Sequence, residues 1–291
     1  MQKVMAMVNR CKFLLYSCLF FSQVFCAVPL PNTAQILISV SDYDSQDTDL
    51  SSYALTFPIN SYSSIDVPIL GNFCINSADS EMDPLLVNDA SSRFFSVYQN
   101  SSWFIKTGSV VVDIGAKSGG YAFGFKKIDS ALTVYAFEHD LKQFTQMIVN
   151  QNLQSSFAIN YQRIGLSDTS GWVNPGSGYP NKNGTVNSTR GPGLVQILPL
   201  DSFGLMNVSF IKINAGGNEL DVLNGANTTI TQSLPTVLIL FSGGEIDYTT
   251  ADIERKNYID SCVNFLLNLN YTSVYLYGST FLFLSSQSQF R

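Results

Sequence analysis

Short apolar segments recur along this chain and alternate with segments in which apolar residues have helical spacing. The apolar segments are continuous, as in strands that are buried on both faces of a sheet. Strands that alternate with helices are joined by right-handed crossovers and form a mostly parallel sheet. The chain is therefore expected to have an α/β fold, in which helices cover both faces of one sheet.

The expected elements can be placed along the sequence. Strands are expected at residues 109–114, 132–137, 157–166, 208–213, 236–241, 273–278 and 280–285. Helices are expected at residues 84–98, from the end of the first strand through Phe125, from Asp140 to about Leu153, and at residues 218–230 and 250–268. Residues 168–193 are rich in Gly, Asn, Ser and Pro and are expected to form a loop. The last two strands are too close together for a helical crossover, so they are expected to pair antiparallel.

Composition supports a packed domain and excludes one class of partner. Hydrophobic residues make up 45% of the 291 residues, which is enough for a large core. Charged residues make up only 13%, where about 25% is typical of soluble domains. The formal net charge is -6, and Lys and Arg do not cluster into the basic surface that a nucleic acid requires. No nucleic-acid partner is expected.

The beginning of the chain has the features of a targeting segment. Lys3, Arg10 and Lys12 precede an uncharged, largely apolar run over residues 13–30, with a small residue near its end, as in a secretory signal. The run is also long enough to span a bilayer, for which about 17–25 residues suffice, so a signal anchor is an alternative. We expect a signal peptide or signal anchor at residues 1–27 and a secreted or single-pass membrane-anchored glycoprotein of the secretory pathway.

N-glycosylation sequons agree with the secretory pathway, although an Asn-rich chain produces some by chance. They begin at Asn100, Asn183, Asn187, Asn207, Asn227 and Asn270. Cys74 and Cys262 lie beyond the targeting segment and could form a disulfide in an oxidising compartment. Cys262 also shares helical spacing with Ile259 and Leu266, which favours a position in the core. Both interpretations stay open.

A glycine-rich turn follows the strand at residues 109–114. Asp113 lies near the end of that strand, and Gly115 and Gly119 follow it. In an open α/β sheet, ligands bind beyond the carboxyl ends of the strands, which is where this turn is expected. Lys117 stands where the dinucleotide fingerprint requires its second glycine, and no Gly-Lys-Ser/Thr sequence follows. A turn that binds phosphate is therefore disfavoured.

Glu138 follows the next expected strand and gives a second indication of a nucleoside-like ligand. A carboxylate at this position can accept hydrogen bonds from ribose hydroxyls, which both NAD and S-adenosylmethionine would offer. The glycine spacing favours S-adenosylmethionine, which carries no phosphate, over the cofactor of an NAD-type oxidoreductase. A simpler interpretation is that the glycines only allow the strand and the helix to pack closely.

Five sequence blocks, in this order, resemble the FkbM-type methyltransferases. The blocks are DIGAKSGGYA, VYAFEHD, IGLSD, LDSFGLMNVSFIKINAGGNELDVLNGA and PTVLILF, and the resemblance covers roughly residues 85–245. It implies a Rossmann-like class I methyltransferase sandwich, with a mostly parallel seven-stranded sheet and a C-terminal antiparallel hairpin. It also implies S-adenosylmethionine as the methyl donor and O-methylation of hydroxyls on glycans or small molecules. The expected organisation is a variable extension at residues 28–84 and an FkbM-like domain at residues 85–291.

The resemblance implies roles for the residues of the cofactor site. Glu138 matches the acid that binds ribose, and Asp168 matches the acidic residue after the third strand, on the adenine side. Lys117 replaces a usual Asn of the turn, and its ammonium group could pair with the methionine carboxylate of the cofactor or point to solvent. The residues expected to bind the cofactor are Asp113, Gly115, Lys117, Gly119, Glu138 and Asp168.

The positions expected to face the methyl acceptor, which we call the acceptor side, depart from the family pattern. Asn214 replaces an aspartate, Gly216 replaces a glutamate, and Leu240 stands where a further glutamate is usual. O-methylation needs a group that removes the hydroxyl proton. The catalytic candidates are Asn214, which can orient an acceptor, Glu219, which also suits the first turn of a helix, and His139, the only histidine. The chain is expected to be an O-methyltransferase or, alternatively, a non-catalytic binding or interaction protein that keeps the fold.

Overall fold

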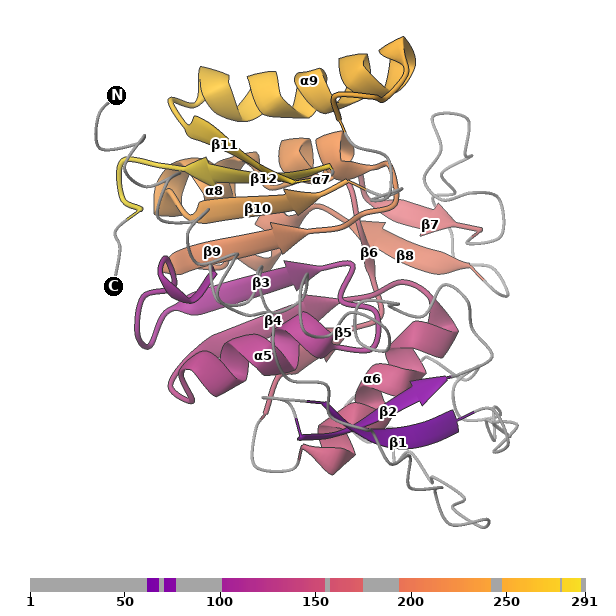
Figure 1. The fold of residues 1–291 in the computed structure, drawn as a ribbon. Helices are drawn as coiled ribbons and strands as arrows, with labels where there is room; N and C mark the ends of the chain where they lie inside the picture. Colours follow the sequence, from indigo (N-terminus) through magenta and orange to yellow (C-terminus); the bar gives the residue numbers. More distant parts are fainter. Residues whose placement is uncertain are drawn as a thin grey trace.

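A seven-stranded sheet forms the centre of the fold (Figure 1). It is seen in a computed structural model that describes residues 62–67, 71–76, 101–154, 158–174, 194–241, 248–277 and 279–288. The strand order is β11-β12-β10-β9-β3-β4-β5. The strands are β3 (Val110–Ile114), β4 (Thr133–Phe137), β5 (Asn160–Gln162), β9 (Val208–Ile213), β10 (Thr236–Leu240), β11 (Thr272–Tyr277) and β12 (Thr280–Leu284).

The pairing of these strands confirms the predicted sheet. β3 pairs in parallel with β4 and β9, β4 pairs in parallel with β5, and β9 pairs in parallel with β10. β12 runs antiparallel to both β10 and β11, so the last two strands form the expected hairpin. The glycine-rich turn follows β3, which has a parallel neighbour on each side. The carboxyl ends of three strands therefore meet at this turn.

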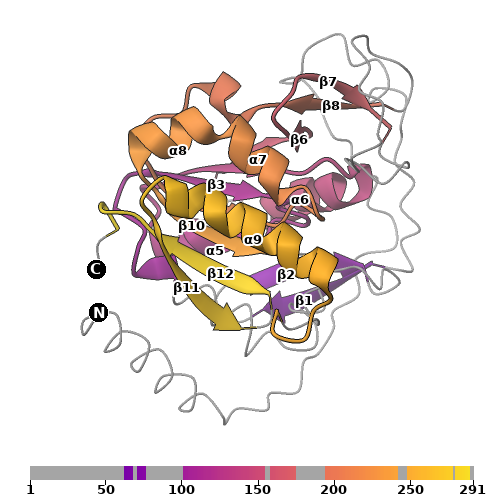
Figure 2. The same cartoon turned by 90° about the horizontal axis from the view of Figure 1, so that it is seen from above.

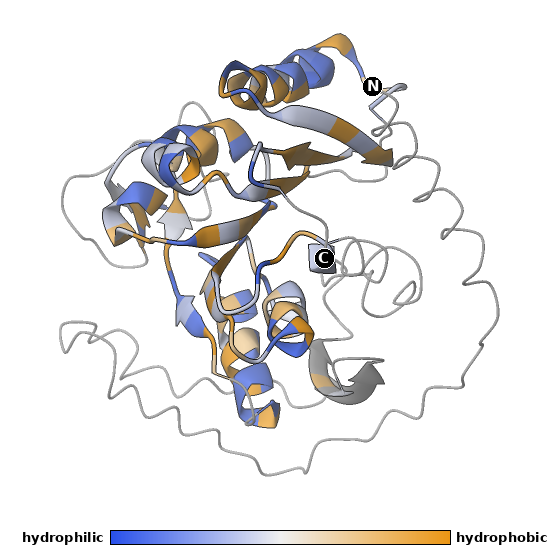
Figure 3. Ribbon diagram, turned by 90° about the vertical axis from the view of Figure 1, so that its left-hand side faces the viewer, coloured by the Kyte–Doolittle hydropathy of each residue, from blue (hydrophilic) through white to orange (hydrophobic). Residues whose placement is uncertain are grey.

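Helices cover both faces of the sheet (Figure 2). They are α5 (Gly120–Ile128), α6 (Leu141–Leu153), α7 (Glu219–Gly225), α8 (Asn227–Ser233) and α9 (Ile253–Asn268). α5 and α6 bury apolar residues in one cluster, and α7, α8 and α9 bury theirs in a second cluster. In β12, Leu282 belongs to the first cluster and Phe281 and Phe283 to the second, because successive side chains of a strand point to opposite faces. Figure 3 shows that hydrophobic residues concentrate on the strands and on the helix faces that cover them.

A small hairpin belongs to the cluster that contains α5 and α6. β1 (Tyr62–Val67) and β2 (Gly71–Asn76) pair antiparallel in a two-stranded sheet. Phe73 is fully buried in that cluster and meets the ring of Phe123 edge-on, with 5.9 Å between the ring centroids. Part of the N-terminal extension is therefore part of the hydrophobic core.

Several predictions concern residues that are not described. The targeting segment expected at residues 1–27 and the helix expected at residues 84–98 lie outside the described residues. Within the described ranges, no helix is long and apolar enough to cross a membrane. Cys262 is a free thiol that is fully buried on α9, which confirms its predicted core position. The side chain of Cys74 lies outside the described residues.

The strand predicted over residues 157–166 was wrong in its extent. β5 ends at Gln162, and β6 (Gly165–Leu166) pairs instead with β8 in a separate three-stranded sheet that also contains β7. β5 is an edge strand with exposed or half-exposed side chains, so little buried apolar surface holds a longer strand in the main sheet. The loop predicted over residues 168–193 was also partly wrong, because β7 (Gly171–Val173) lies within it. β8 (Val195–Leu198) was not predicted.

The helix predicted over residues 218–230 is two helices, α7 and α8, which meet at Ala226. Asp201, from a short 3-10 helix, accepts hydrogen bonds from the N–H groups of Thr228 at 2.8 Å and Thr229 at 2.7 Å. It thereby satisfies N–H groups that the start of a helix leaves free. The cap comes from a residue far away in the sequence, so periodicity within the segment did not reveal the break.

Candidate functional site

The turn after β3 is tied to both neighbouring strands at the carboxyl edge of the sheet. Gly115 and Ala116 both donate their N–H groups to the carbonyl of Phe137, the last residue of β4, at 3.0 Å. Asn214, which follows β9, donates its N–H group to the carbonyl of Ile114 at 2.9 Å. The structure therefore brings together the glycine turn, the residues after β4 and the segment that begins at Asn214.

The two glycines of the turn are required by close packing of the backbone. Gly115 has a φ of 68°, and a Cβ there would lie 1.9 Å from the carbonyl oxygen of Asn214. Gly119 has a φ of 91°, and a Cβ there would lie 2.6 Å from the ring of Phe123. Packing alone accounts for these glycines, so their contact with a cofactor stays a prediction. Lys117 also has a positive φ, of 51°, in a region that Asn adopts more readily than most residues.

Glu138 lies directly after β4 and holds the glycine turn in place. Its side chain is buried, and Oε2 accepts the N–H group of Lys117 at 2.8 Å. Oε1 accepts the N–H group of Asp140 at 2.8 Å and lies 3.3 Å from Nδ1 of His139. A carboxylate offers about four acceptor positions. The contacts of Glu138 leave one position, on Oε2, for a further donor, which fits a ribose hydroxyl.

Glu138 and His139 change each other's ionisation. Burial would raise the pKa of Glu138, but the hydrogen bond and charge of His139, together with the N–H groups of Asp140 and Lys117, lower it below its usual value of 4.5. Burial would lower the pKa of His139, but the hydrogen bond and charge of Glu138 raise it above its usual value of 6.5. The contact is therefore most favourable when Glu138 is ionised and His139 is protonated.

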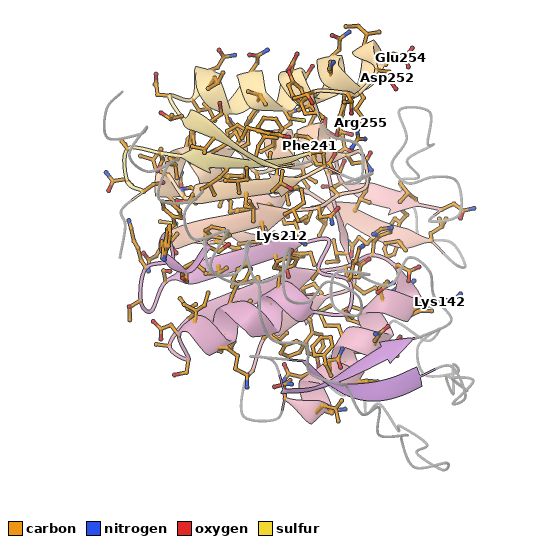
Figure 4. All side chains as sticks on the ribbon, viewed as in Figure 1. Lys142, Lys212, Phe241, Asp252, Glu254 and Arg255 are labelled. Carbon is orange, nitrogen blue, oxygen red and sulfur yellow. The ribbon has the colours of Figure 1, made fainter. Side chains whose placement is uncertain are left out.

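A buried ion pair supports the turn, and it was not predicted from the sequence. Nζ of Lys212, on β9, lies 2.8 Å from Oδ1 of Asp113, and both residues are almost completely buried (Figure 4). Nζ also donates to the carbonyls of Gly115 at 2.8 Å and Ile114 at 3.3 Å, and it lies 5.1 Å from the centre of the Tyr121 ring. Burial raises the pKa of Asp113, and the charge of Lys212 opposes this rise. The available signal was the one charged residue in the strand VSFIKI.

Glu219 begins α7 and takes part in structural contacts. It is fully buried, and Oε1 accepts the N–H groups of Ala215 and Gly217, both at 3.2 Å. Oε2 accepts the hydroxyl of Tyr258, on α9, at 2.7 Å. Glu219 therefore holds the segment between β9 and α7 against α9. A catalytic role for Glu219 stays a prediction, and this geometry supports the structural interpretation.

Asp168 and the side chain of Asn214 lie in different surroundings. Asp168 follows β6 and is exposed, and its Oδ1 accepts the hydroxyl of Ser167 at 3.4 Å. Because β6 belongs to the three-stranded sheet, that sheet positions Asp168, and its adenine-side role stays a prediction. Asn214 directly follows β9, beside the turn, and is half-buried, and its role in orienting an acceptor stays a prediction.

Replacing Lys212 by Met should leave the carboxylate of Asp113 buried without its partner. Loss of one member of a buried pair is expected to lower the free energy of unfolding by about 3–5 kcal/mol. The double variant Asp113→Asn, Lys212→Met removes both charges and should recover most of that loss. Urea denaturation of the single and double variants measures this. A double variant that is as unstable as Lys212→Met would contradict the pairing.

Replacing His139 by Gln should lower stability in a pH-dependent way. The raised pKa of His139 means that its contribution is present below about pH 6.5 and is lost as pH rises through the folded-state pKa. The lowered pKa of Glu138 means that its contribution is present above about pH 4.5 and is lost as pH falls through the folded-state pKa. Wild type should exceed His139→Gln in stability near pH 5.5 and lose this advantage by about pH 8.5. If the stability advantage of wild type over His139→Gln grew with pH, the contact between His139 and Glu138 would favour neutral His139, contrary to this prediction.

Several solved structures are similar to this chain. The crystal structure of methyltransferase FkbM from Methylobacillus flagellatus is 16% identical, with a TM-score of 0.46, over 68% of this chain and 52% of that chain. A precorrin-6y C5,15-methyltransferase from Geobacter metallireducens is 10% identical, with a TM-score of 0.39, over 65% and 83% of the two chains. A SAM-dependent methyltransferase from Aquifex aeolicus is 13% identical, with a TM-score of 0.35, over 64% and 85%. The matched part of this chain spans about half the length of the Methylobacillus flagellatus protein.

A family model provides the decisive comparison, since no curated protein matches the chain. The model of the methyltransferase FkbM domain matches residues 113–272, which is more than half of the 291 residues. The matched segment begins at Asp113 and contains the glycine turn, Glu138 and Lys212. The fold agrees with this match, because the sheet has the mostly parallel order and the antiparallel hairpin that the resemblance implied. The chain belongs to the FkbM methyltransferase family.

Proposed function

We propose that this protein transfers a methyl group from S-adenosylmethionine to a hydroxyl of a glycan or a small molecule. Family membership implies S-adenosylmethionine as the methyl donor. The observation that carries the proposal is the position of Glu138, which is bound to the glycine turn through Lys117 and keeps one acceptor position open. A ribose hydroxyl suits that position, whereas the carboxylate would repel a phosphate.

Different residues around the turn would bind different parts of the cofactor. Glu138 would accept a ribose hydroxyl. The ammonium group of Lys117 has no partner among the described residues, so it is available to a carboxylate such as that of the methionine moiety. Asp113 is engaged by Lys212 and would act by positioning the turn. When bound, S-adenosylmethionine supplies a methyl group on a positively charged sulfur, which makes the group open to attack by an oxygen.

We infer that His139 accepts the proton of the acceptor hydroxyl. It is the only histidine, it follows Glu138 directly, and 37% of its side chain is exposed. Its Nδ1 faces the carboxylate of Glu138, an arrangement that orients an imidazole as a general base through Nε2. Nε2 of His139 would take the hydroxyl proton when the acceptor oxygen receives the methyl group that the bound cofactor would supply. Asn214 would orient the acceptor.

A non-catalytic binding protein is the second candidate, and specific residues favour it. Asn214, Gly216 and Leu240 stand where the family usually has carboxylates. Glu219 is the acidic catalytic candidate nearest to Asn214 in the sequence, and both of its oxygens are occupied by structural contacts. His139 is therefore the candidate that remains for the general base. If His139 does not take the hydroxyl proton, the protein would bind ligands without catalysing methyl transfer.

We infer that the protein enters the secretory pathway as a secreted or single-pass membrane-anchored glycoprotein. The basic residues and the apolar run before residue 31 support this. Asn207, Asn227 and Asn270 each begin a sequon and are exposed, so a glycan at any of them would extend into solvent.

The protein from a eukaryotic secretory host should lose apparent mass on treatment with an N-glycosidase. Unchanged mass, with the chain retained in the cytosol, would contradict the inference.

Calorimetry with S-adenosylmethionine tests the cofactor half of the site. The full chain should bind it, and Glu138→Gln should weaken binding about 10–100-fold, because a hydrogen bond to a charged group contributes about 1.5–3 kcal/mol. Glu254→Gln, an exposed change in the first turn of α9, is the matched control and should bind like wild type. No binding at millimolar cofactor would exclude a methyltransferase and leave the non-catalytic candidate.

Transfer of a labelled methyl group to a panel of glycans and small hydroxy compounds tests the acceptor half. His139→Gln should lower the rate by about 10²–10⁴-fold, which is the usual contribution of a general base. Cofactor binding without transfer to any member of the panel would favour the non-catalytic candidate.

A further inference from the structure

We propose that Arg255 forms a binding site for an oxyanion carried by the methyl acceptor, so that the acceptor is an acidic hydroxy compound such as an acidic sugar. The group bound would be a carboxylate, sulfate or phosphate. The identity of the ligand as a methyl acceptor rests on the proposed function, whereas the anion site itself can be tested without any methyl transfer.

The guanidinium group of Arg255 contains buried atoms without partners. Nε and Nη2 are both buried, and neither has a hydrogen-bond partner among the residues that the structure describes. Two nearby carboxylates have other contacts: Asp252, the N-cap of α9, accepts the backbone N–H group of Arg255 at 2.8 Å, and Asp260 accepts the hydroxyl of Tyr248 at 2.7 Å. A third, Glu254, is exposed. Buried donors without acceptors are unfavourable, and an oxyanion is the group that matches the planar donor pattern of Arg.

Arg255 lies at the carboxyl edge of the sheet, where the proposed reaction occurs. β10 ends at Leu240 on this edge, and α9 starts at Ile253 and runs back toward the start of β11. Side chains on a helix lean toward its N-terminus, so the side chain of Arg255 leans toward this edge. Figure 4 shows Arg255 and Phe241, the residue after β10, at the end of the molecule where the parallel strands stop.

The inward face of α9 connects Arg255 to the acceptor segment. Tyr258 and Ile259 lie three and four residues further along the helix, and residues at this spacing are neighbours on one face. Ile259 is fully buried, and the hydroxyl of Tyr258 donates to Oε2 of Glu219 at 2.7 Å. Glu219 in turn binds the N–H groups between β9 and α7. An anion bound by Arg255 would therefore lie next to the segment that follows Asn214.

The charges of this edge agree with an acidic acceptor. Carboxylates at positions 214, 216 and 240, as the family pattern has them, would repel an anion held nearby. This chain has Asn214, Gly216 and Leu240 there, and on α9 Nε and Nη2 of Arg255 have no hydrogen-bond partner among the described residues. The absence of these acids and the presence of Arg255 both favour an acceptor that carries negative charge.

Binding of glucuronate and of glucose to the full chain tests the site, since the two sugars differ in one carboxylate. Calorimetry should detect binding of glucuronate at millimolar concentration. The protein should bind glucuronate at least about tenfold more tightly than glucose, in line with a charge-assisted bidentate contact. Arg255→Met should lose this preference, and Lys142→Met, which removes an exposed cation on α6, should keep it. Inorganic phosphate and sulfate as further probes show which oxyanion binds best. Equal binding of both sugars to wild type would overturn the proposal.

Thermal stability gives a second readout, for which a purely structural role of Arg255 predicts the opposite result. Because Nε and Nη2 of Arg255 have no hydrogen-bond partner among the described residues, Arg255→Met should be at least as stable as wild type in a buffer without oxyanions. Added phosphate should raise the melting temperature of wild type more than that of Arg255→Met, since only wild type has the site. A variant that fails to fold, or that gains as much from phosphate as wild type, would overturn the proposal.

Cofactor binding, measured on the same proteins, separates this inference from the proposed function. Arg255→Met should bind S-adenosylmethionine with the affinity of wild type. Wild type that binds S-adenosylmethionine but does not distinguish glucuronate from glucose would overturn the anion site alone. Wild type that binds glucuronate but not S-adenosylmethionine would overturn the methyltransferase and leave a protein that binds acidic sugars.

Discussion

Lys212 brings a positive charge into the middle of a sheet that is covered on both faces, and Asp113 meets it from the adjacent strand. The two residues are opposite each other in the register of β3 and β9. Such a pair is tolerated only when further contacts satisfy the donors, and here the carbonyls of Ile114 and Gly115 and the ring of Tyr121 do so. Because one of these carbonyls belongs to the last residue of β3 and the other to the first residue of the turn, the ion pair fixes the start of the turn as well as the register of the strands.

This arrangement explains how the two halves of the site can change independently. Asp113 stands two residues before Gly115, and Lys212 stands two residues before Asn214. The turn is held by groups inside the sheet and by Glu138, none of which belongs to the segment that follows Asn214. That segment is held instead by Glu219 and Tyr258. Substitutions in that segment therefore leave the support of the glycine turn intact, and the chain keeps the turn glycines while it departs from the family pattern at Asn214 and Gly216.

Features that a local stretch of sequence determines could be predicted, whereas features that depend on contacts between distant residues could not. β3, β9 and β10 were placed correctly because strands covered on both faces have continuous apolar sequences. The break between α7 and α8 was missed because Asp201 supplies the cap from outside the segment. The length of β5 was missed because an edge strand with polar side chains has no such sequence signal. The partner of Asp113 depends on the register of two strands that are distant in the sequence, and no local pattern encodes it.

The acceptor side shows why the missing carboxylates do not decide catalysis by themselves. A carboxylate can serve such a site as a base or as a group that orients the acceptor, and these tasks are separable. In our proposal, His139 takes the first task beside Glu138, and Arg255 takes the second for an acceptor with an oxyanion. The acids that the family has at positions 214, 216 and 240 would weaken the binding of that acceptor, because each would oppose its charge. Replacement of these acids is therefore compatible with a change of acceptor as well as with a loss of activity.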